Sequence, residues 1–386
     1  MSRCIGCGVK IQTTDSSAIG YIPEIALIER GEQVYCKRCY DIRHHNIKYV
    51  ANYNTSAYYE KMKVIQHQRS LVLLMIDVLD IYGGFIPHLS TCIGDNPVFI
   101  VVNKVDILPK GFPIQKLENR IREIANEHSI HVISIMMISA KKAKDVQKII
   151  EKISKLKYPS RQKKEYRYIK NKEKTTRFGD CYIVGCASVG KSTFMNMVGK
   201  LTLHYPDEII TTNSQYQTTL DFIKWPLDQN SHLIDTPGLI NENHFGAYLN
   251  NESIQLLIPK TYIKPRTYQL RTEQSILIGG LVQLDFECDQ GVNVSFYISN
   301  DLYLHRTKTT EVERAKKSLA YHKLVPPYTP EESNNIQQLT TYDFLIEQPM
   351  DLFICGIGFV HIVSGHAHIK VTIDKRILVR CVESFI

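Results

Sequence analysis

The chain has 386 residues, enough for about two to three domains, and its 44% hydrophobic and 22% charged residues are ordinary for a globular protein. No stretch approaches the roughly 18 consecutive apolar residues of a membrane-spanning helix, which excludes a helical integral membrane protein. The net charge of +8 favours a polyanionic partner. Because we expect no signal peptide, the ten cysteines favour reduced thiols or metal over a disulfide framework.

Residues 1–48 are predicted to form a small cysteine unit. Cys4 and Cys7 make one C-x₂-C pair, and Cys36 and Cys39 make a second pair after an interval of 28 residues. Four thiolates suit one tetrahedral Zn²⁺, and the metal would supply the folding energy that so short a segment lacks. The alternative is two independent redox or buried pairs, but two paired motifs favour zinc.

Residues 49–254 have the pattern of an α/β domain built on a doubly wound, mostly parallel sheet. Short apolar runs predict buried strands, and amphipathic stretches between them predict helices. The predicted strands are 70–76, 97–102, 131–138, 181–184, 220–225 and 232–234, and the predicted helices include 115–127 and 142–157.

The second of these strands runs into an N-K-x-D motif, and ligands of open α/β sheets bind at such strand ends. The Asp106 carboxylate can accept hydrogen bonds from guanine N1–H and the exocyclic amine, whereas adenine would leave it unpaired. Asn103 is expected at the base edge, and the stem of Lys104 over the base plane. Ser139, Ala140 and Lys141 follow the next strand and would direct a backbone N–H at guanine O6.

The stretch GCASVGKS fits the P-loop pattern G-x-x-x-x-G-K-[ST], with a predicted strand before it and a helix after it. Backbone N–H groups at such a helix start cradle phosphate oxygens. Lys191 would place a cation on the β- and γ-phosphates, and the Ser192 hydroxyl would bind Mg²⁺. The complete set of expected phosphate-binding residues is Gly185, Ser188, Val189, Gly190, Lys191, Ser192 and Thr193.

A switch region is predicted after the P-loop. Asp235 opens the sequence DTPG after a strand, and this D-x-x-G pattern lets the Asp hold Mg²⁺ through water while the Gly238 N–H meets the γ-phosphate. Thr219 is the candidate Mg²⁺-sensing threonine, and Thr218 is the near alternative because the spacing leaves the choice open. Lys191, Thr219 and Gly238 are therefore the residues expected to act in catalysis.

Residues 255–386 change class and predict a β-rich α+β domain. Strand-like segments cover 275–286, 292–298, 350–363 and 367–379, with glycines between them and one basic helix at about 311–321.

Two stretches offer cations beside aromatic rings. Residues 152–177 hold eleven Lys or Arg against two Glu, and they are either a solvated linker or a patch that faces RNA. The C-terminal domain offers a second set of the kind RNA binders use, against the alternative of an ordinary polar face. Its members are Tyr303, His305, Arg306, Lys308, Lys316 and Lys317.

The order of the motifs is itself informative. Ordinary GTPases begin with the P-loop, whereas here N-K-x-D and Ser-Ala-Lys come before it. A doubly wound sheet accepts this if its termini are joined and the chain is cut at another surface loop. The sequence therefore predicts a circularly permuted G domain whose DTPG switch lies directly upstream of the C-terminal domain.

With these motifs in place, the chain resembles the YqeH-type circularly permuted GTPases of bacteria over essentially its whole length. The stretches CIGCGVKIQT, GYIPE, VYCKRCY, SILIGGL and LYLHRTK add to the resemblance. It implies GTP and GDP as ligands, Mg²⁺ and Zn²⁺ as cofactors, and a role in assembly of the small ribosomal subunit. It also implies that the C-terminal domain contacts RNA or protein.

Two positions depart from that family. Its members usually carry Asn where this chain has Ser188, and that Asn helps to bind a K⁺ ion that aids hydrolysis. Its switch usually reads PGTT, where this chain has Tyr216-Gln217-Thr218-Thr219. In addition, Leu239 stands where Ras-like enzymes use Gln to orient water, so we expect slow hydrolysis that a partner or ion accelerates.

The leading hypothesis is thus a GTP-hydrolysing molecular switch that docks on a small-subunit precursor, its rRNA and its proteins. The alternative is an RNA- or ribosome-binding scaffold in which GTP is mainly structural. Because the chain begins directly on a cysteine motif, we expect no signal or transit peptide and a cytoplasmic location, with no membrane or DNA as partner.

Overall fold

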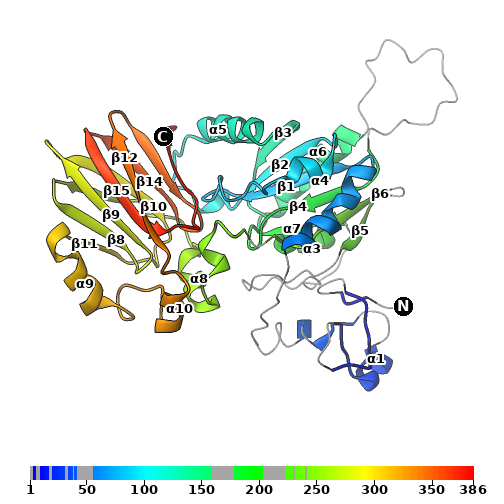
Figure 1. The fold of residues 1–386 in the computed structure, drawn as a ribbon. Coiled ribbons are helices and arrows are strands. Elements are labelled where there is room, and N and C mark those ends of the chain that lie inside the picture. Colours follow the sequence, from blue (N-terminus) through cyan, green and yellow to red (C-terminus); the bar gives the residue numbers. More distant parts are fainter. Residues whose placement is uncertain are drawn as a thin grey trace, which may run out of the picture. The chain divides into compact units, whose positions relative to one another are not determined.

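The structure is a computed structural model, and it describes residues 3–5, 9–16, 20–30, 34–37, 39–40, 55–157, 178–202, 222–228, 231–239 and 241–386 (Figure 1). The described part forms two compact units. Unit 1 consists of residues 1–77, 85–105 and 125–239, and unit 2 of residues 78–84, 106–124 and 240–386. Unit 2 therefore takes two short segments from the first half of the chain.

Unit 1 is built on a six-stranded sheet in the order β3-β2-β1-β4-β6-β5. The strands are β1 (Leu71–Asp77), β2 (Val98–Asn103), β3 (Val132–Met137), β4 (Cys181–Val184), β5 (Ile223–Asp228) and β6 (Ser231–Asp235). All neighbouring pairs are parallel except β5 with β6, and a mostly parallel sheet is typical of a doubly wound fold. The central strands β1, β2 and β4 are buried on both faces, which explains their continuous apolar runs.

Helices precede and connect these strands, and residues 106–124 among them belong to unit 2. They are α1 (Glu24–Arg30), α3 (Thr55–Met62), α4 (Leu89–Ile93), α5 (Ile114–Glu127), α6 (Ala143–Lys157) and α7 (Lys191–Thr202), with 3-10 turns η1 (Lys63–His67) and η2 (Val105–Ile107). The boundary between the two units runs within α5, after Ile124. None of the described helices is long and apolar enough to cross a bilayer.

One predicted strand is displaced. We expected a strand at 220–225, and β5 instead continues through Pro226 to Asp228. Proline cannot donate to a ladder and is tolerated on an edge strand, and β5 is the edge of this sheet.

Unit 2 contains two five-stranded antiparallel sheets, in the orders β16-β13-β14-β10-β7 and β11-β8-β9-β15-β12. The strands are β7 (Arg266–Leu270), β8 (Gln274–Ile278), β9 (Val282–Cys288), β10 (Val292–Ile298), β11 (Leu304–Lys308), β12 (Leu339–Ile346), β13 (Met350–Ile354), β14 (Gly358–Ser364), β15 (Ala367–Asp374) and β16 (Val379–Glu383). Short helices join them: η3 (Phe245–Ala247), α8 (Asn251–Leu257), η4 (Thr309–Glu311), α9 (Val312–Leu319) and α10 (Pro330–Asn334). The C-terminal region is thus β-rich, as predicted.

Two long predicted segments are each divided into a pair of strands. Residues 275–286 form β8 and β9 around Gly279, and residues 350–363 form β13 and β14 around Gly356. Both glycines have positive φ angles, +52° and +86°, which reverse the chain between antiparallel partners. The predicted segments do not include β7, β11, β12 or, beyond its first residue, β16. Strand β12 lies at a sheet edge, and all its residues except Ile346 are exposed or half-buried, so it lacks a long buried apolar run.

Candidate functional site

The P-loop connects the end of β4 to the start of α7, and close approach explains both of its glycines. A Cβ on Gly185 would lie 2.4 Å from the Met75 carbonyl oxygen. Gly190 has a φ of +99°, and a Cβ there would lie 2.2 Å from Asn103 Nδ2. Ser188 also occupies the left-handed region, at φ 63°. The loop is therefore folded tightly against the ends of two neighbouring strands.

Lys191 begins α7 and is buried. Its Nζ donates hydrogen bonds to the carbonyl oxygens of Gly185, at 2.8 Å, and Cys186, at 2.9 Å. Burial lowers the pKa of Lys191, and the nearby carboxylate of Asp235 opposes that shift. A desolvated cation at a helix N-terminus is suited to an anionic ligand. Ser192 and Thr193 follow it, half-buried, in the first turn of the same helix.

The DTPG segment lies directly on the P-loop. It leaves β6 at the fully buried Asp235, and both the N–H and the hydroxyl of Thr236 donate to the Ile183 carbonyl. At its far end, Leu239 accepts a 2.8 Å hydrogen bond from Ala187 N–H. Between them, a Cβ on Gly238 would lie 3.0 Å from Lys191 Nζ. Two motifs about 50 residues apart in the chain thus share one backbone network.

Asn103, at the end of β2, joins a third and a fourth motif to this network. Its Nδ2 donates to the Val189 carbonyl of the P-loop at 2.8 Å, and its Oδ1 accepts from Ala140 N–H at 2.8 Å. Asn103 is 3% exposed, so both hydrogen bonds are shielded from water. The neighbouring Ser139 N–H is bonded to the Asp145 carboxylate, which fixes the start of that loop.

Lys104 has a φ of 68°, and its Nζ pairs with Asp77 Oδ2 at 2.6 Å. We did not predict Asp77 as part of the site. The signal was present, because Asp77 ends β1 directly opposite Asn103, and β6 also ends in a carboxylate, Asp235. Asp77 therefore fixes the side chain of Lys104, whose stem is expected to cover the base plane.

The remaining predicted residues are distributed as follows. Asp106 is half-buried in η2, next in the chain to Val105, whose N–H bonds to the Ile138 carbonyl. Lys141 is exposed. Thr218 and Thr219 lie outside the described residues, as does Cys7.

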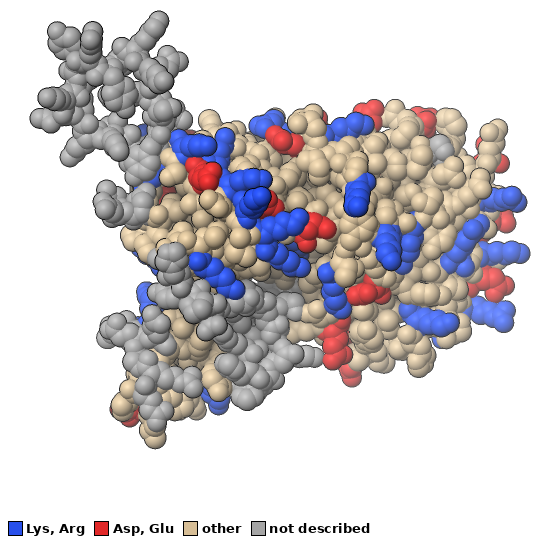
Figure 2. Space-filling model, turned by 180° about the vertical axis from the view of Figure 1, so that it is seen from behind, with Lys and Arg blue, Asp and Glu red and all other residues tan. Residues whose placement is uncertain are grey.

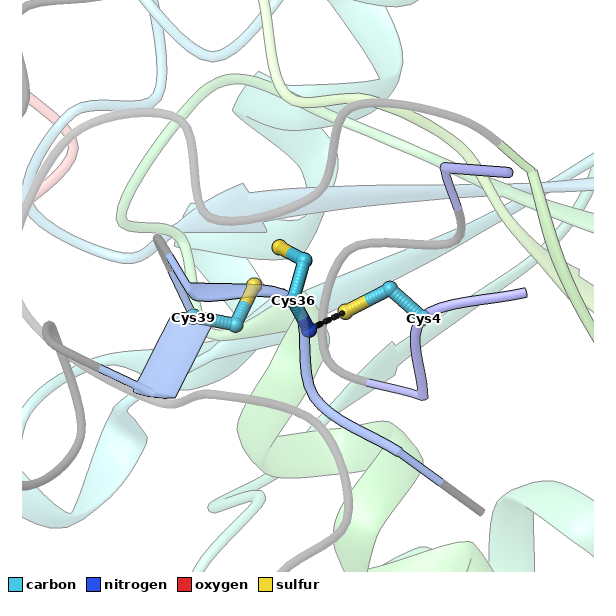
Figure 3. Close-up of side chains that lie close together, drawn as sticks. All are labelled: Cys4, Cys36 and Cys39. Carbon is cyan, nitrogen blue, oxygen red and sulfur yellow. Dashed lines mark hydrogen bonds between the residues drawn. The ribbon is translucent and has the colours of Figure 1, made fainter. Parts of the chain in front are cut away.

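Three cysteines of the N-terminal region converge. The Sγ atoms of Cys4, Cys36 and Cys39 all lie within 4.8 Å of one another, and all three residues are buried (Figure 3). The Cys36 N–H donates to Cys4 Sγ at 3.2 Å. Tetrahedral Zn–S bonds of about 2.3 Å separate two sulfurs by about 3.8 Å, so this donor set fits a zinc ion.

Two family profiles match the chain, both of them after residue 179. A sequence profile described as "50S ribosome-binding GTPase" matches residues 180–274, and one described as "YqeH-like, C-terminal" matches residues 292–385.

Individual proteins align over most of the chain. It is 33% identical over 358 residues to the YqeH protein of Bacillus subtilis, and the alignment covers 92% of each chain. It is 25% identical over 398 residues to a "Putative nitric oxide synthase" of Oryza sativa, covering 93% of this chain and 69% of that one. Among solved structures, a GDP-bound TM YlqF gives 15% identity, covers 46% of this chain and 56% of that chain, and has a TM-score of 0.27, too low to support an argument.

Proposed function

We propose that this chain, which belongs to the YqeH family of GTPases and hydrolyses GTP, uses its nucleotide as a switch in assembly of the small ribosomal subunit. The observation that carries the switch is the network around Asn103. Asn103 is hydrogen-bonded both to the P-loop and to the loop of residues 139–141, here called the Ala140 loop. The DTPG segment is bonded to the same P-loop. A change in the phosphates would therefore reach several loops together.

Each predicted residue is proposed to keep one role. The P-loop amides and Lys191 hold the β- and γ-phosphates, and Gly238 N–H contacts the γ-phosphate. Asp106 reads guanine, with Asn103 at the base edge. The stem of Lys104 covers the base plane, and a backbone N–H of residues 139–141 is directed at guanine O6.

The donors expected for Mg²⁺ suit that ion. Asp235 supplies a buried carboxylate and Ser192 a hydroxyl, and hard oxygen ligands are what Mg²⁺ prefers. Thr219 is proposed as the third. When bound, the metal would neutralise charge on the transferring phosphoryl group.

Slow unassisted hydrolysis follows from Leu239. Its side chain is 3% exposed and cannot hydrogen-bond a water molecule, and its backbone is bonded to the P-loop on both sides. Ser188 likewise replaces the Asn that serves K⁺ in the family. Lys191 and the loop amides would stabilise charge, while the water-orienting group would come from a partner or an ion.

The proposed partner is the precursor of the small subunit, met in the cytoplasm. Exposed cations lie on β11 and α9, at Arg306, Lys308 and Lys317, and His305 of β11 is stacked on the ring of Tyr303. Figure 2 shows Lys and Arg side chains scattered over one face of the molecule, with Asp and Glu between them. The exposed cations of β11 and α9 and the rings of Tyr303 and His305 favour binding to the phosphates and bases of rRNA.

The test is co-sedimentation of the purified protein with small-subunit precursors, mature small subunits and large subunits, each with GDP or a non-hydrolysable GTP analogue. We expect the triphosphate form to bind small-subunit precursors at least about tenfold more tightly than the GDP form, as a coupling of about 1.4 kcal/mol requires. GTPase rates measured in the same mixtures, in K⁺ and in Na⁺ buffers, should rise only with the particle that binds.

Three outcomes would count against this function. Preference for the large subunit would move the role to that particle, in keeping with the name of the profile at residues 180–274. Equal binding with both nucleotides and no stimulation would favour the scaffold in which GTP is structural. A turnover of many GTP per second by the protein alone would contradict the role given to Leu239.

A further inference from the structure

We infer that Phe112 is a positioning residue for guanine recognition, acting through the backbone that carries Asp106. The inference rests on the proposed base-reading role of Asp106. Every contact that carries it lies within unit 2, to which residues 106–124 and the β-rich sheets both belong.

The Asp106 carboxylate is placed by its backbone alone. The residue is half-buried, and none of the residues that the structure describes donates a hydrogen bond to its side chain. Lys104, by contrast, is held by Asp77, and Asn103 by two hydrogen bonds. The carboxylate is therefore placed by the backbone on both sides of it, through the bond from Val105 N–H to the Ile138 carbonyl before it and through the contacts of the chain after it.

The chain after Asp106 is bonded to the segment that leads into β7. The Ile107 carbonyl accepts a 2.8 Å hydrogen bond from Ile263 N–H. Three residues further on, Lys110 N–H donates to the hydroxyl of Tyr262 at 2.5 Å. Ile107 is also 3% exposed, so the first of these contacts is shielded from water.

Phe112 ends this attachment in a cluster of aromatic rings. Its ring lies edge-on to those of Tyr297, at 6.0 Å, Phe359, at 6.3 Å, and Phe385, at 6.3 Å between centroids. Edge-to-face geometry at these separations is favourable, and three partners orient the ring more strictly than one would. They come from β10, from β14 and from the residues after β16, which all belong to one sheet of unit 2 or directly follow it.

Loss of this anchor should weaken recognition of the base rather than of the phosphates. Asp106 is expected to accept from guanine N1–H and from the exocyclic amine. Inosine triphosphate lacks that amine but has the same phosphates and ribose. The ratio of GTP to ITP affinity therefore reports the placement of the Asp106 carboxylate, and the fraction of active protein cancels from it.

The experiment compares that ratio in the full-length protein, by titration with each nucleotide, for the wild type, Phe112→Ala and Tyr262→Phe. We expect a wild-type ratio of about tenfold or more, since it measures one hydrogen bond to a charged group. Phe112→Ala should lower it to about two- to threefold, and Tyr262→Phe, which removes a single oxygen atom, should fall between the two. The matched control is Phe344→Ala, which removes a half-buried ring stacked on Tyr342 in β12 and should leave the ratio unchanged.

A further variant, Asp106→Asn, distinguishes failure of this inference from failure of the base-reading role on which it rests. Asp106→Asn should abolish the preference for GTP and admit xanthosine triphosphate. If it does so, but neither Phe112→Ala nor Tyr262→Phe changes the GTP/ITP ratio, Phe112 has no positioning role. If Asp106→Asn changes nothing, base reading by Asp106 is wrong and the inference falls with it.

Discussion

At the scale of single residues, Asn103 shows how one amide can join distant motifs. It satisfies the Val189 carbonyl of the P-loop, 86 residues further along the chain, and the Ala140 N–H, 37 residues further along. An amide is the one side chain that both donates and accepts with a fixed geometry at this length. Leaving a buried backbone group without its hydrogen-bond partner lowers the free energy of unfolding, even when no ligand is bound.

Asn103→Ala should therefore destabilise unit 1 by roughly 2–4 kcal/mol, because it leaves two buried backbone groups unpaired. The measurement is urea unfolding followed by fluorescence of Trp225, the only tryptophan, which is 6% exposed in β5 of unit 1. Ser231→Ala is the control. The buried Ser231 Oγ has no hydrogen-bond partner among the described residues, so its removal should change stability by less than about 1 kcal/mol. Equal effects of the two variants would contradict the role of Asn103 as a connection.

At the scale of elements, the two segments that carry the N-terminal cysteines are too short to bury a stabilising hydrophobic core of their own. Among the described residues, the partly buried apolar neighbours of Cys4, Cys36 and Cys39 are Val9, Ile11 and Tyr35. So small a core does not stabilise a fold alone, and a metal is the common substitute.

We therefore expect one Zn²⁺ per chain in purified protein, measured by elemental analysis. A chelator should release it, and Cys4, Cys36 and Cys39 should then react with a thiol reagent, as followed by mass spectrometry. Cys355, which is 1% exposed in unit 2, is the internal control and should stay protected. A folded protein without metal, whose N-terminal thiols titrate freely, would disprove the zinc site.

At the scale of the whole molecule, the order of motifs in the chain differs from their order in the sheet. Asn103 ends β2 and the P-loop follows β4, and both strands are neighbours of β1. The carboxyl ends of parallel strands lie at the same end of the sheet, so the loops that follow these strands meet whatever their order in the chain. The same topology places the DTPG segment immediately before residue 240, where unit 2 resumes.

The distribution of charge over the molecule leads to a further prediction. If the cations of β11 contact rRNA phosphates, the logarithm of affinity should fall linearly with the logarithm of salt concentration. Arg306→Gln and Lys308→Gln should each reduce the slope by about 0.7 to 0.9, the counterion released per contact. Lys370→Gln is the control, because Lys370 is already paired with Glu287 at 2.6 Å on the strand pair β15–β9. Unchanged slopes in both β11 variants would place the RNA contact elsewhere.

Local sequence was sufficient for the strands of the parallel sheet, the P-loop with its flanking strand and helix, and the β-rich class of the C-terminal region. Those features depend on the period of apolar residues and on glycines within one turn. The junction of Asn103 with Val189 and Ala140, the pairing of Lys104 with Asp77, and the seat of Phe112 among Tyr297, Phe359 and Phe385 were decided by tertiary structure alone. The partners in the long-range contacts are separated by tens to hundreds of residues, and no periodicity in the chain specifies which distant side chains will meet once the sheets have formed.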